Sequence, residues 1–201
     1  RLDVASSGLV LAAKTYEAYY DLALQLNIGH LVRDYFVLCH GWMDPGRHEI
    51  SERVHWSNEY NRPSSVQKGG KPSISRLKVL AHMFRGNSKF SLIAVRLATG
   101  RRHQIRMHTA HIGHPTVCDN MYTSPAMFEE DSKWCARNFL HRYHLVFWDS
   151  TNLQKKVLQQ LPMDLLRALQ HLHPRNAQSS RVLAHQWEFA TDSGLLGWDN
   201  C

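Results

Sequence analysis

Two short segments carry the side chains that could do chemistry, and the first contains an aspartate. Asp3 lies in residues 1–8 (RLDVASSG), directly ahead of the apolar run 8–13. A carboxylate held rigidly at the end of a strand can act as a nucleophile. Aspartate is also common as an ordinary turn residue. Asp3 is therefore a candidate nucleophile, although this segment alone does not separate the two roles.

The second segment, residues 99–108 (TGRRHQIRMH), follows a predicted strand and opens a predicted helix. The first turn of a helix offers backbone N–H groups without partners, and these attract anions. Arg101, Arg102 and His103 add cationic side chains at that point. The segment therefore suits a phosphate or a carboxylate, although a basic surface helix would have the same composition.

Together the two segments resemble the RluA family of RNA pseudouridine synthases. Members carry the motif HRLDxxTSG and, later in the chain, TGRTHQIRVH. The further matches, in family order, are Arg33-Asp34-Tyr35 with a KxY strand, residues 70–75 (GKPSIS) with a GKxAxT strand, residues 110–115 (AHIGHP) followed by Asp119 and Tyr122, and residues 161–165 (LPMDL) with an LPxD stretch. The resemblance covers residues 1–173, and several motifs in order are more specific than any single one.

The resemblance implies an isomerase that converts uridine to pseudouridine in RNA, without a metal or an organic cofactor. Asp3 would attack the target uridine, at ribose C1′ or at base C6, and the uracil would be rejoined through C5. Arg101 would be the ion partner of Asp3. Tyr35 would stack on the uracil and could take the C5 proton. Arg1 would help to displace the flipped nucleotide, because a base inside a helix is out of reach until it is extruded.

Four more residues of the second segment receive looser roles from the resemblance. Arg102, His103, Gln104 and Arg106 are expected to contact phosphates or to support the site. For His108 a purely structural role is the stronger expectation.

The chain departs from the family pattern at several positions. Ser6 replaces threonine, Arg33 replaces lysine and Arg102 replaces threonine. Cys118 and Asn120 stand where the family usually has glycine and proline, on either side of Asp119.

Charge supports RNA as the partner. The chain carries a net charge of +7, and no aspartate or glutamate occurs between residues 60 and 118. A segment without acids presents a positive field to a polyanion, although acids from elsewhere in the fold could neutralise it. The basic residues expected to bind RNA in this segment include Arg62, Lys68 and Lys71.

The expected substrate is a structured ribosomal or transfer RNA. The main alternative is a catalytically idle, synthase-derived RNA-binding protein, for example a component of a ribosome or of its assembly complex. A zinc site is disfavoured, because His103 and His108 are five residues apart and do not share a helix face. The widely spaced cysteines favour free thiols in an intracellular protein, with mitochondria preferred over the nucleus and cytoplasm. No apolar run is long enough for a membrane-spanning helix.

The elements that must position these residues indicate an α+β domain with a mixed, mostly antiparallel sheet flanked by helices. Hydrophobic patterns predict strands at 8–13, 32–38, 74–80, 91–97 and 142–147, short strands in an irregular region at 44–70, and helices at 15–29, 101–112 and 162–174. The first helix should face inward with Tyr19, Leu22 and Leu26. Residues 1–173 would form the N-terminally incomplete catalytic domain, and residues 174–201 a C-terminal extension.

Overall fold

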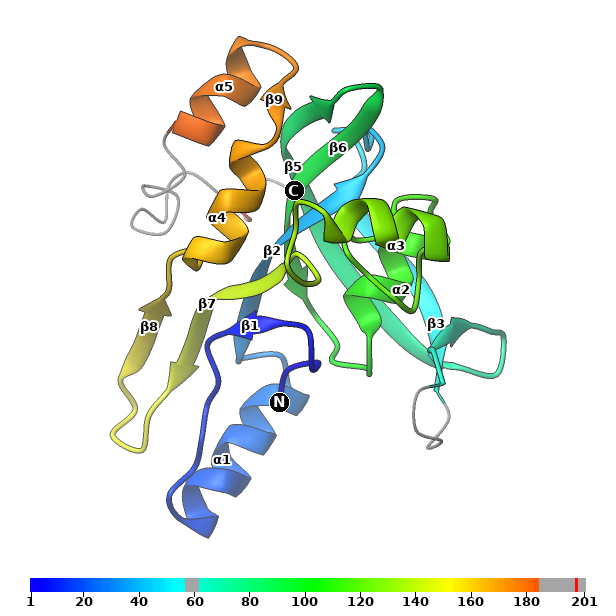
Figure 1. Ribbon diagram of the computed structural model, residues 1–201. Coiled ribbons are helices and arrows are strands. Elements are labelled where there is room, and N and C mark those ends of the chain that lie inside the picture. The colour runs from blue at the N-terminus through cyan, green and yellow to red at the C-terminus, as the bar shows by residue number, and fades with distance from the viewer. Residues whose placement is uncertain (57–61, 185–197, 199–201) are drawn as a thin grey trace.

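The computed structural model describes residues 1–56, 62–184 and 198, and in them an α+β domain built on one large sheet (Figure 1). The strands are β1 (Ser7–Gly8), β2 (Val32–His40), β3 (Glu49–His55), β4 (Ser65–Val66), β5 (Lys71–Arg85), β6 (Ser88–Leu97), β7 (Leu140–Trp148), β8 (Gln154–Leu158) and β9 (His173–Pro174). The helices are α1 (Tyr16–Asn27), α2 (Gln104–His111), α3 (Pro125–Ser132), α4 (Met163–Gln170) and α5 (Ala177–Ala184).

The sheet runs in the order β1-β7-β2-β6-β5-β3-β4, with β8 beside β7 and β9 beside β5. Strand β1 is parallel to β7, and all other pairings are antiparallel. The long β5–β6 hairpin and β2 form the middle of the sheet. Because β2 is paired on both sides and covered on both faces, seven of its nine residues are buried.

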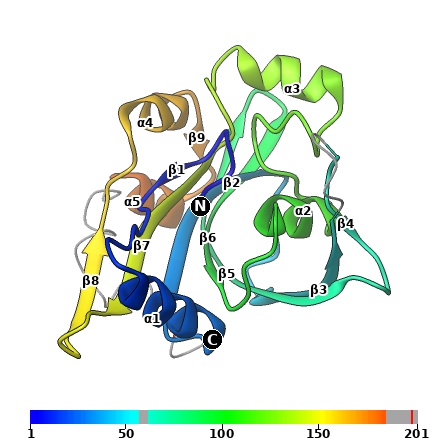
Figure 2. The ribbon, with the colours of Figure 1, turned by 90° about the horizontal axis from the view of Figure 1, so that it is seen from below.

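The sheet carries a hydrophobic core on each face. Helices α3, α4 and α5 pack on one face, around Phe36, Leu165 and Leu169. Helix α2 packs on the other face through Ile105, in a cluster that also contains Tyr35. Figure 2 shows α2 inside the curve made by β6, β5 and β3. The candidate residues of the second segment are therefore held against the same face of the sheet as Tyr35.

Most of the predicted elements are confirmed. Thr15 caps α1 by accepting a hydrogen bond from the Ala18 N–H at 3.2 Å, and Gly29 follows the helix with a positive φ of 81°. Strand β7 and helix α4 also form where the patterns place them, with Tyr143 and Leu165 buried. The alternating residue pattern of β7 and the leucine spacing of α4 thus predict correctly that Tyr143 and Leu165 are buried.

The predicted strand at 8–13 is wrong. Only Ser7 and Gly8 pair, opposite His141 and Arg142, because β8 occupies the same edge of β7 from His144 onward. With no strand left to pair with, residues 9–13 are exposed or half-buried.

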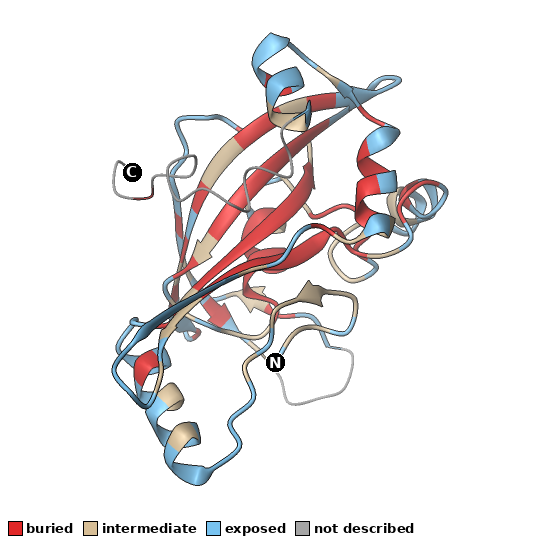
Figure 3. Ribbon diagram, turned by 90° about the vertical axis from the view of Figure 1, so that its left-hand side faces the viewer, coloured by how far each residue is buried: buried red, intermediate tan, exposed pale blue. Residues whose placement is uncertain are grey.

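The predicted inner face of α1 is also wrong. Tyr19 is 58% exposed and Leu26 is 40% exposed. The buried residue of α1 is Gln25, which donates to the Trp148 carbonyl at 2.8 Å and accepts from the Trp148 N–H at 2.9 Å. This helix docks by hydrogen bonds at the end of β7, and Figure 3 shows most of its surface exposed.

The described part of the C-terminal segment lies against the same sheet as the rest. Strand β9 pairs with β5 at Met83 and Phe84, and Ser179 of α5 accepts a hydrogen bond from the His82 N–H. The division of the chain at residue 173 stays a prediction. In the described residues, no helix has the length and apolar character needed to cross a bilayer.

Candidate active site

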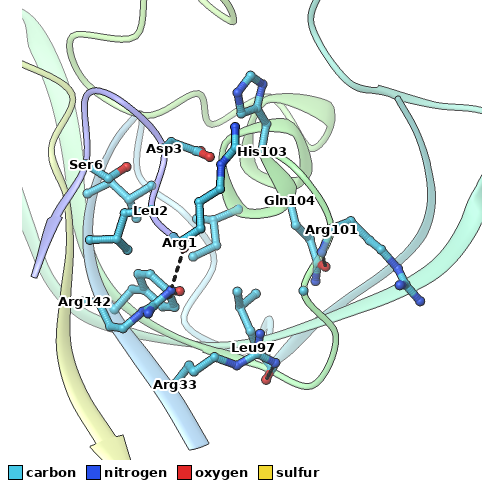
Figure 4. Close-up of a pocket in the computed structure, with 14 residues that line it drawn as sticks. Arg1, Leu2, Asp3, Ser6, Arg33, Leu97, Arg101, His103, Gln104 and Arg142 are labelled. Carbon is cyan, nitrogen blue, oxygen red and sulfur yellow. Dashed lines mark hydrogen bonds between the residues drawn. The ribbon is translucent and has the colours of Figure 1, made fainter. Parts of the chain in front are cut away.

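A pocket of about 120 Å³ opens where the N-terminal turn meets the ends of β2, β6 and β7 and the turn before α2 (Figure 4). Its lining includes six of the residues singled out from the sequence: Arg1, Asp3, Tyr35, Arg101, His103 and Gln104. Arg106 lies directly behind this lining and touches it through Asp3. Segments that are far apart in the sequence therefore converge on one cavity.

The ion partner of Asp3 is Arg106. The Asp3 carboxylate is held in a turn that the Ser6 N–H closes on the Asp3 carbonyl at 2.9 Å, and it lies 3.7 Å from Arg106 Nη1. Arg106 is itself fixed by Asp119, which accepts from its Nε at 2.7 Å and from its Nη2 at 2.6 Å. A bidentate pair of this kind fixes the plane of the guanidinium. The remaining nitrogen of Arg106 is thereby aimed at Asp3.

Asp119 and Arg106 each stabilise the charged form of the other. Burial alone would raise the pKa of Asp119, but the hydrogen bonds and charge of Arg106 outweigh it and lower that pKa. Burial would lower the pKa of Arg106, but Asp119, with a smaller contribution from Asp3, raises it. The pair stays ionised, and a fixed positive charge faces the candidate nucleophile.

The expected pairing of Arg101 with Asp3 is wrong. Arg101 lines the pocket, but its side chain points away from Asp3 (Figure 4), and its buried Nε has no hydrogen-bond partner in the structure. The physical reason lies in the backbone. His103 adopts a left-handed conformation with φ 55°, so α2 begins at Gln104 and Arg101 stays in the turn before it.

Tyr35 is 5% exposed and borders the pocket, and its hydroxyl is held by Arg142. Arg142 Nε donates to the Tyr35 hydroxyl at 2.8 Å, and its Nη1 donates to the Leu9 carbonyl at 3.0 Å. A third hydrogen bond runs from Nη2 to the Arg1 carbonyl at 3.4 Å (Figure 4). Arg142 thus ties the N-terminal turn that carries Asp3 to the tyrosine.

Burial raises the pKa of Tyr35, while the charge and hydrogen bond of Arg142 and the charge of Arg33 act in the opposite direction. Arg33 is also in the pocket wall, 7% exposed, and donates to the Leu97 carbonyl at 3.2 Å. Burial lowers the pKa of Arg33. Two guanidinium groups therefore stand beside the tyrosine hydroxyl and favour any negative charge that develops there.

Gln104 and His108 serve the scaffold. The Gln104 carbonyl oxygen accepts from Thr99 and from the Arg101 N–H, and its amide donates to the Ile74 carbonyl and to Ser75. His108 is fully buried, with Nδ1 at 3.0 Å from the Ser75 hydroxyl. Burial lowers the pKa of His108 to about 4. These contacts lock α2 to β5, as a structural role for His108 requires.

His103 connects the pocket to the basic residues around β4. Its Nδ1 lies 3.2 Å from the Tyr122 hydroxyl, which accepts from the Ser64 N–H at 2.7 Å, while the Ser64 hydroxyl donates to the Arg102 carbonyl at 2.9 Å. Burial lowers the pKa of His103. Arg62 and Lys68 are exposed near Ser64, outside the pocket.

Lys71, at the start of β5, is exposed as well, with its ammonium 5.1 Å from the centroid of the Trp56 ring. Some basic residues of the acid-free segment are not exposed to solvent alone but are paired with acids. Arg96 is turned inward to Asp34, and Arg76 lies 4.0 Å from Glu49. Acids from other strands therefore neutralise part of the segment, while Arg62, Lys68 and Lys71 form an exposed basic group outside the pocket.

The sequence comparison decides the family. Residues 1–111 match the family model described as RNA pseudouridylate synthase. The chain belongs to this family.

Curated members of the RNA pseudouridylate synthase family match over part of their length. The ribosomal large subunit pseudouridine synthase D of Salmonella typhimurium is 36% identical over 122 residues, which are 61% of this chain and 36% of that protein. The protein of the same name from Buchnera aphidicola is 36% identical over 156 residues, 72% of this chain and 47% of that protein. The chain thus spans about a third to a half of the length of these relatives.

Solved structures agree on the fold. Human RNA Pseudouridylate Synthase Domain Containing 1 superposes with a TM-score of 0.68 at 20% identity, covering 87% of this chain and 73% of that one. Human RNA Pseudouridylate Synthase Domain Containing 4 gives 0.61 at 12% identity, covering 81% and 70%. The pseudouridylate synthase fold, a mixed and mostly antiparallel sheet with flanking helices, is therefore confirmed.

Sequence reasoning misses two features of this family member. The alternating pattern of residues 142–147 places Arg142 on the polar face of a half-buried strand, but β7 is covered on both faces, so Arg142 is 8% exposed in the pocket wall. The pairing of Arg106 with Asp3 had no local signal that separates it from Arg101, because both arginines belong to the same motif segment.

The turn at Cys118 still places Asp119 against Arg106, although the glycine that is usual in the family is replaced by cysteine. Cys118 adopts a left-handed conformation with φ 56°, which a glycine would enter more easily. Its N–H donates to Asp131 at 2.8 Å, and the following Asp119 still reaches Arg106 and the Thr116 hydroxyl. Cys39, Cys118 and Cys135 are free thiols. In the part of the chain that the structure describes, no group of three or more His, Cys, Asp or Glu side chains could hold a metal ion.

Proposed function

We propose that this chain provides the catalytic site of an enzyme that isomerises uridine to pseudouridine in structured RNA, with Asp3 as the nucleophile. The observation that carries the proposal is the convergence of Asp3 and Tyr35 on one pocket, with the Asp3 carboxylate facing Arg106 and the tyrosine hydroxyl held by Arg142. Family membership supports the reaction type.

Each group has a defined task in this proposal. Arg106 aims the Asp3 carboxylate, so that it can attack ribose C1′ or base C6 of the target uridine. Tyr35 forms the wall on which the uracil stacks, and when the new C–C bond is complete its hydroxyl passes its own proton to solvent as it takes the C5 proton. Arg33 and Arg142 stabilise the negative charge that passes through the uracil and the tyrosine oxygen.

The remaining predicted residues would bind RNA. Arg1 stands at the pocket, where it can occupy the space that the flipped nucleotide leaves. Arg101 takes a new role at the mouth of the pocket as a phosphate contact, together with Arg102 and His103. Arg62, Lys68 and Lys71 would continue this contact along β4 and β5.

We further propose ribosomal RNA as the substrate class. The relatives named ribosomal large subunit pseudouridine synthase D support this choice over transfer RNA. An intracellular location, with mitochondria preferred, stays a prediction.

The test is a map of pseudouridine in the RNA of cells that lack the protein, compared with cells complemented by the wild type or by Asp3→Asn. Loss of a specific pseudouridine that only the wild type restores would support the enzyme. Normal pseudouridine together with defective ribosomes that Asp3→Asn rescues would instead support the idle RNA-binding protein.

A further inference from the structure

Two cations are stacked on one tryptophan at the end of the sheet remote from the pocket. Lys89 Nζ lies 4.6 Å from the centroid of the Trp42 ring, and the Arg175 guanidinium carbon lies 4.0 Å from it. The indole N–H donates to the Met83 carbonyl at 2.9 Å, which fixes the ring, and His82 lies beside it at 6.1 Å between ring centroids. We call Trp42, His82, Lys89 and Arg175 the Trp42 patch.

The positive charge of this patch is not compensated. Among the described residues neither Lys89 nor Arg175 pairs with a carboxylate, and both are exposed. An exposed cation–π contact contributes only about 0.5–1 kcal/mol. It holds each cation in place but does not cancel the charge. Two positive charges are therefore held against one ring, in an arrangement that an anion would stabilise.

The patch and the pocket share one face of the sheet. In β6, Phe90 packs into the core cluster that contains Trp134, so the neighbouring Lys89 points to the opposite face, where Ile93 and Tyr35 lie. Figure 1 shows the β5–β6 hairpin and β9 at the end of the sheet away from the N-terminal turn.

The separation fits one extended ligand. Strand β2 runs from Tyr35 in the pocket toward the patch, and the five residue steps to His40 span about 17 Å at a rise of about 3.3 Å each. Trp42 follows two residues beyond. A ligand that meets both places must therefore extend well past a single nucleotide.

We propose that the Trp42 patch is a second RNA contact, which holds the phosphate backbone of the same RNA whose target uridine enters the pocket. This inference rests on the proposed function. Two cations already cover the ring, so the patch offers charge to phosphates and does not offer a free ring for base stacking. A fixed pair of cations would set the direction in which the RNA leaves the pocket.

The test compares RNA binding by the double variant Lys89→Glu/Arg175→Glu with a charge-matched control, Lys156→Glu/Arg167→Glu. Lys156 on β8 and Arg167 on α4 are exposed and lie outside the pocket lining. The probes are two synthetic RNAs around one uridine, of about 5 and about 30 nucleotides, so that only the longer one can reach both places.

For the long RNA, the patch variant should raise the dissociation constant about tenfold or more and reduce the slope of log affinity against log salt by about 2 relative to the control. The short RNA should bind the patch variant and the control alike. The neutral variant Lys89→Gln/Arg175→Gln should reduce the slope by a similar amount with a smaller loss of affinity, and it guards against misfolding by the charge reversal. Circular dichroism verifies the fold of each protein.

Equal affinities and salt slopes for the long RNA in the patch variants and the control would overturn the inference, and would leave a protein partner as the occupant. An equal loss with the short RNA would overturn it too, because the charges would then act on the pocket. Both readouts are binding constants. The proposed function is tested by turnover, so either can fail without the other.

Discussion

Arg106 Nη1 lies 3.7 Å from the Asp3 carboxylate, while Nε and Nη2 of the same guanidinium are hydrogen-bonded to Asp119. The distance is that of an ion pair and is too long for a direct hydrogen bond. A free carboxylate oxygen, close to a fixed cation and open to a pocket, is suited to attack a substrate. Arg106 therefore has the role that the motif resemblance gives to Arg101.

Replacing Arg106 with lysine should cut the single-turnover rate roughly 10- to 100-fold. Lysine keeps the charge but lacks the planar fork that binds Asp119 and aims at Asp3. The matched variant Arg101→Lys should change the rate less than about threefold at saturating enzyme, because saturation hides weakened binding but not slowed chemistry. A large loss in Arg101→Lys together with normal turnover in Arg106→Lys would restore Arg101 as the partner of Asp3.

Arg142 should act on the reaction through the Tyr35 hydroxyl. The charged groups around that hydroxyl are Arg142 on β7, Arg33 on β2 and Asp3 in the N-terminal turn. Because Arg142 opposes the rise in the Tyr35 pKa caused by burial, Arg142→Gln should raise that pKa further and slow turnover about 10- to 100-fold.

A double-mutant cycle measures this coupling. In a Tyr35→Phe background, Arg142→Gln should add less than about threefold to the loss. If the two losses multiply independently, Arg142 supports only the N-terminal turn, through the Leu9 and Arg1 carbonyls.

The fully buried His108 predicts a pH-dependent stability. Burial lowers its pKa to about 4 from the ordinary 6.5, so this contribution to stability is complete above pH 6.5 and is lost as the pH falls toward 4. The loss is worth roughly 2–4 kcal/mol. His108→Asn keeps a group for the Ser75 hydroxyl and removes the titration, so its unfolding free energy should fall less between pH 6.5 and 4.5.

Urea unfolding at several pH values measures this effect. The exposed His171 gives the control variant, His171→Asn, which should follow the wild type. A wild-type curve that is flat over this range, or that His108→Asn matches, would show that His108 does not titrate as its burial predicts.

The exposed group Arg62, Lys68 and Lys71 should carry part of the salt dependence of RNA binding. Charge reversal of all three to glutamate should reduce the slope of log affinity against log salt by about 2–3, since lysine and arginine contacts release counterions from phosphates. The control is the exposed triple Lys14→Glu/Lys156→Glu/Arg167→Glu. An unchanged slope in the first triple, relative to the control, would show that this surface does not meet RNA.

The amino-acid sequence predicts the parts of the fold that local pattern determines. The buried strand β2 follows from its β-branched and aromatic residues, and the leucine face of α4 follows from periodicity. The family resemblance predicts that Asp3 and Tyr35 share one site. The orientation of the Arg101 side chain, away from Asp3, could not be predicted in the same way, because it depends on the left-handed backbone at His103. That conformation is unusual for a residue other than glycine.

Two other wrong predictions share a cause. The apolar pattern of residues 9–13 is typical of a strand, but pairing depends on which strand holds the neighbouring edge, and β8 holds it. The pattern around Arg142 is typical of a solvent-facing residue, but both faces of β7 are covered. Neighbours from distant parts of the chain decide such questions, and no local pattern contains them.

The central claim is that Asp3 is the nucleophile, and the replacement Asp3→Asn tests it most directly. Asparagine keeps the shape and removes the negative charge, and Asp44→Asn, in an exposed turn, is the matched control. The measurement is the single-turnover release of tritium from uridine C5 of a labelled RNA, since C5 must lose its hydrogen when it bonds to the ribose. Asp3→Asn should bind the RNA within about threefold of wild type and slow release by about 10⁴-fold or more, as loss of a covalent catalyst does, while Asp44→Asn stays normal. Release by Asp3→Asn near the wild-type rate would contradict the claim.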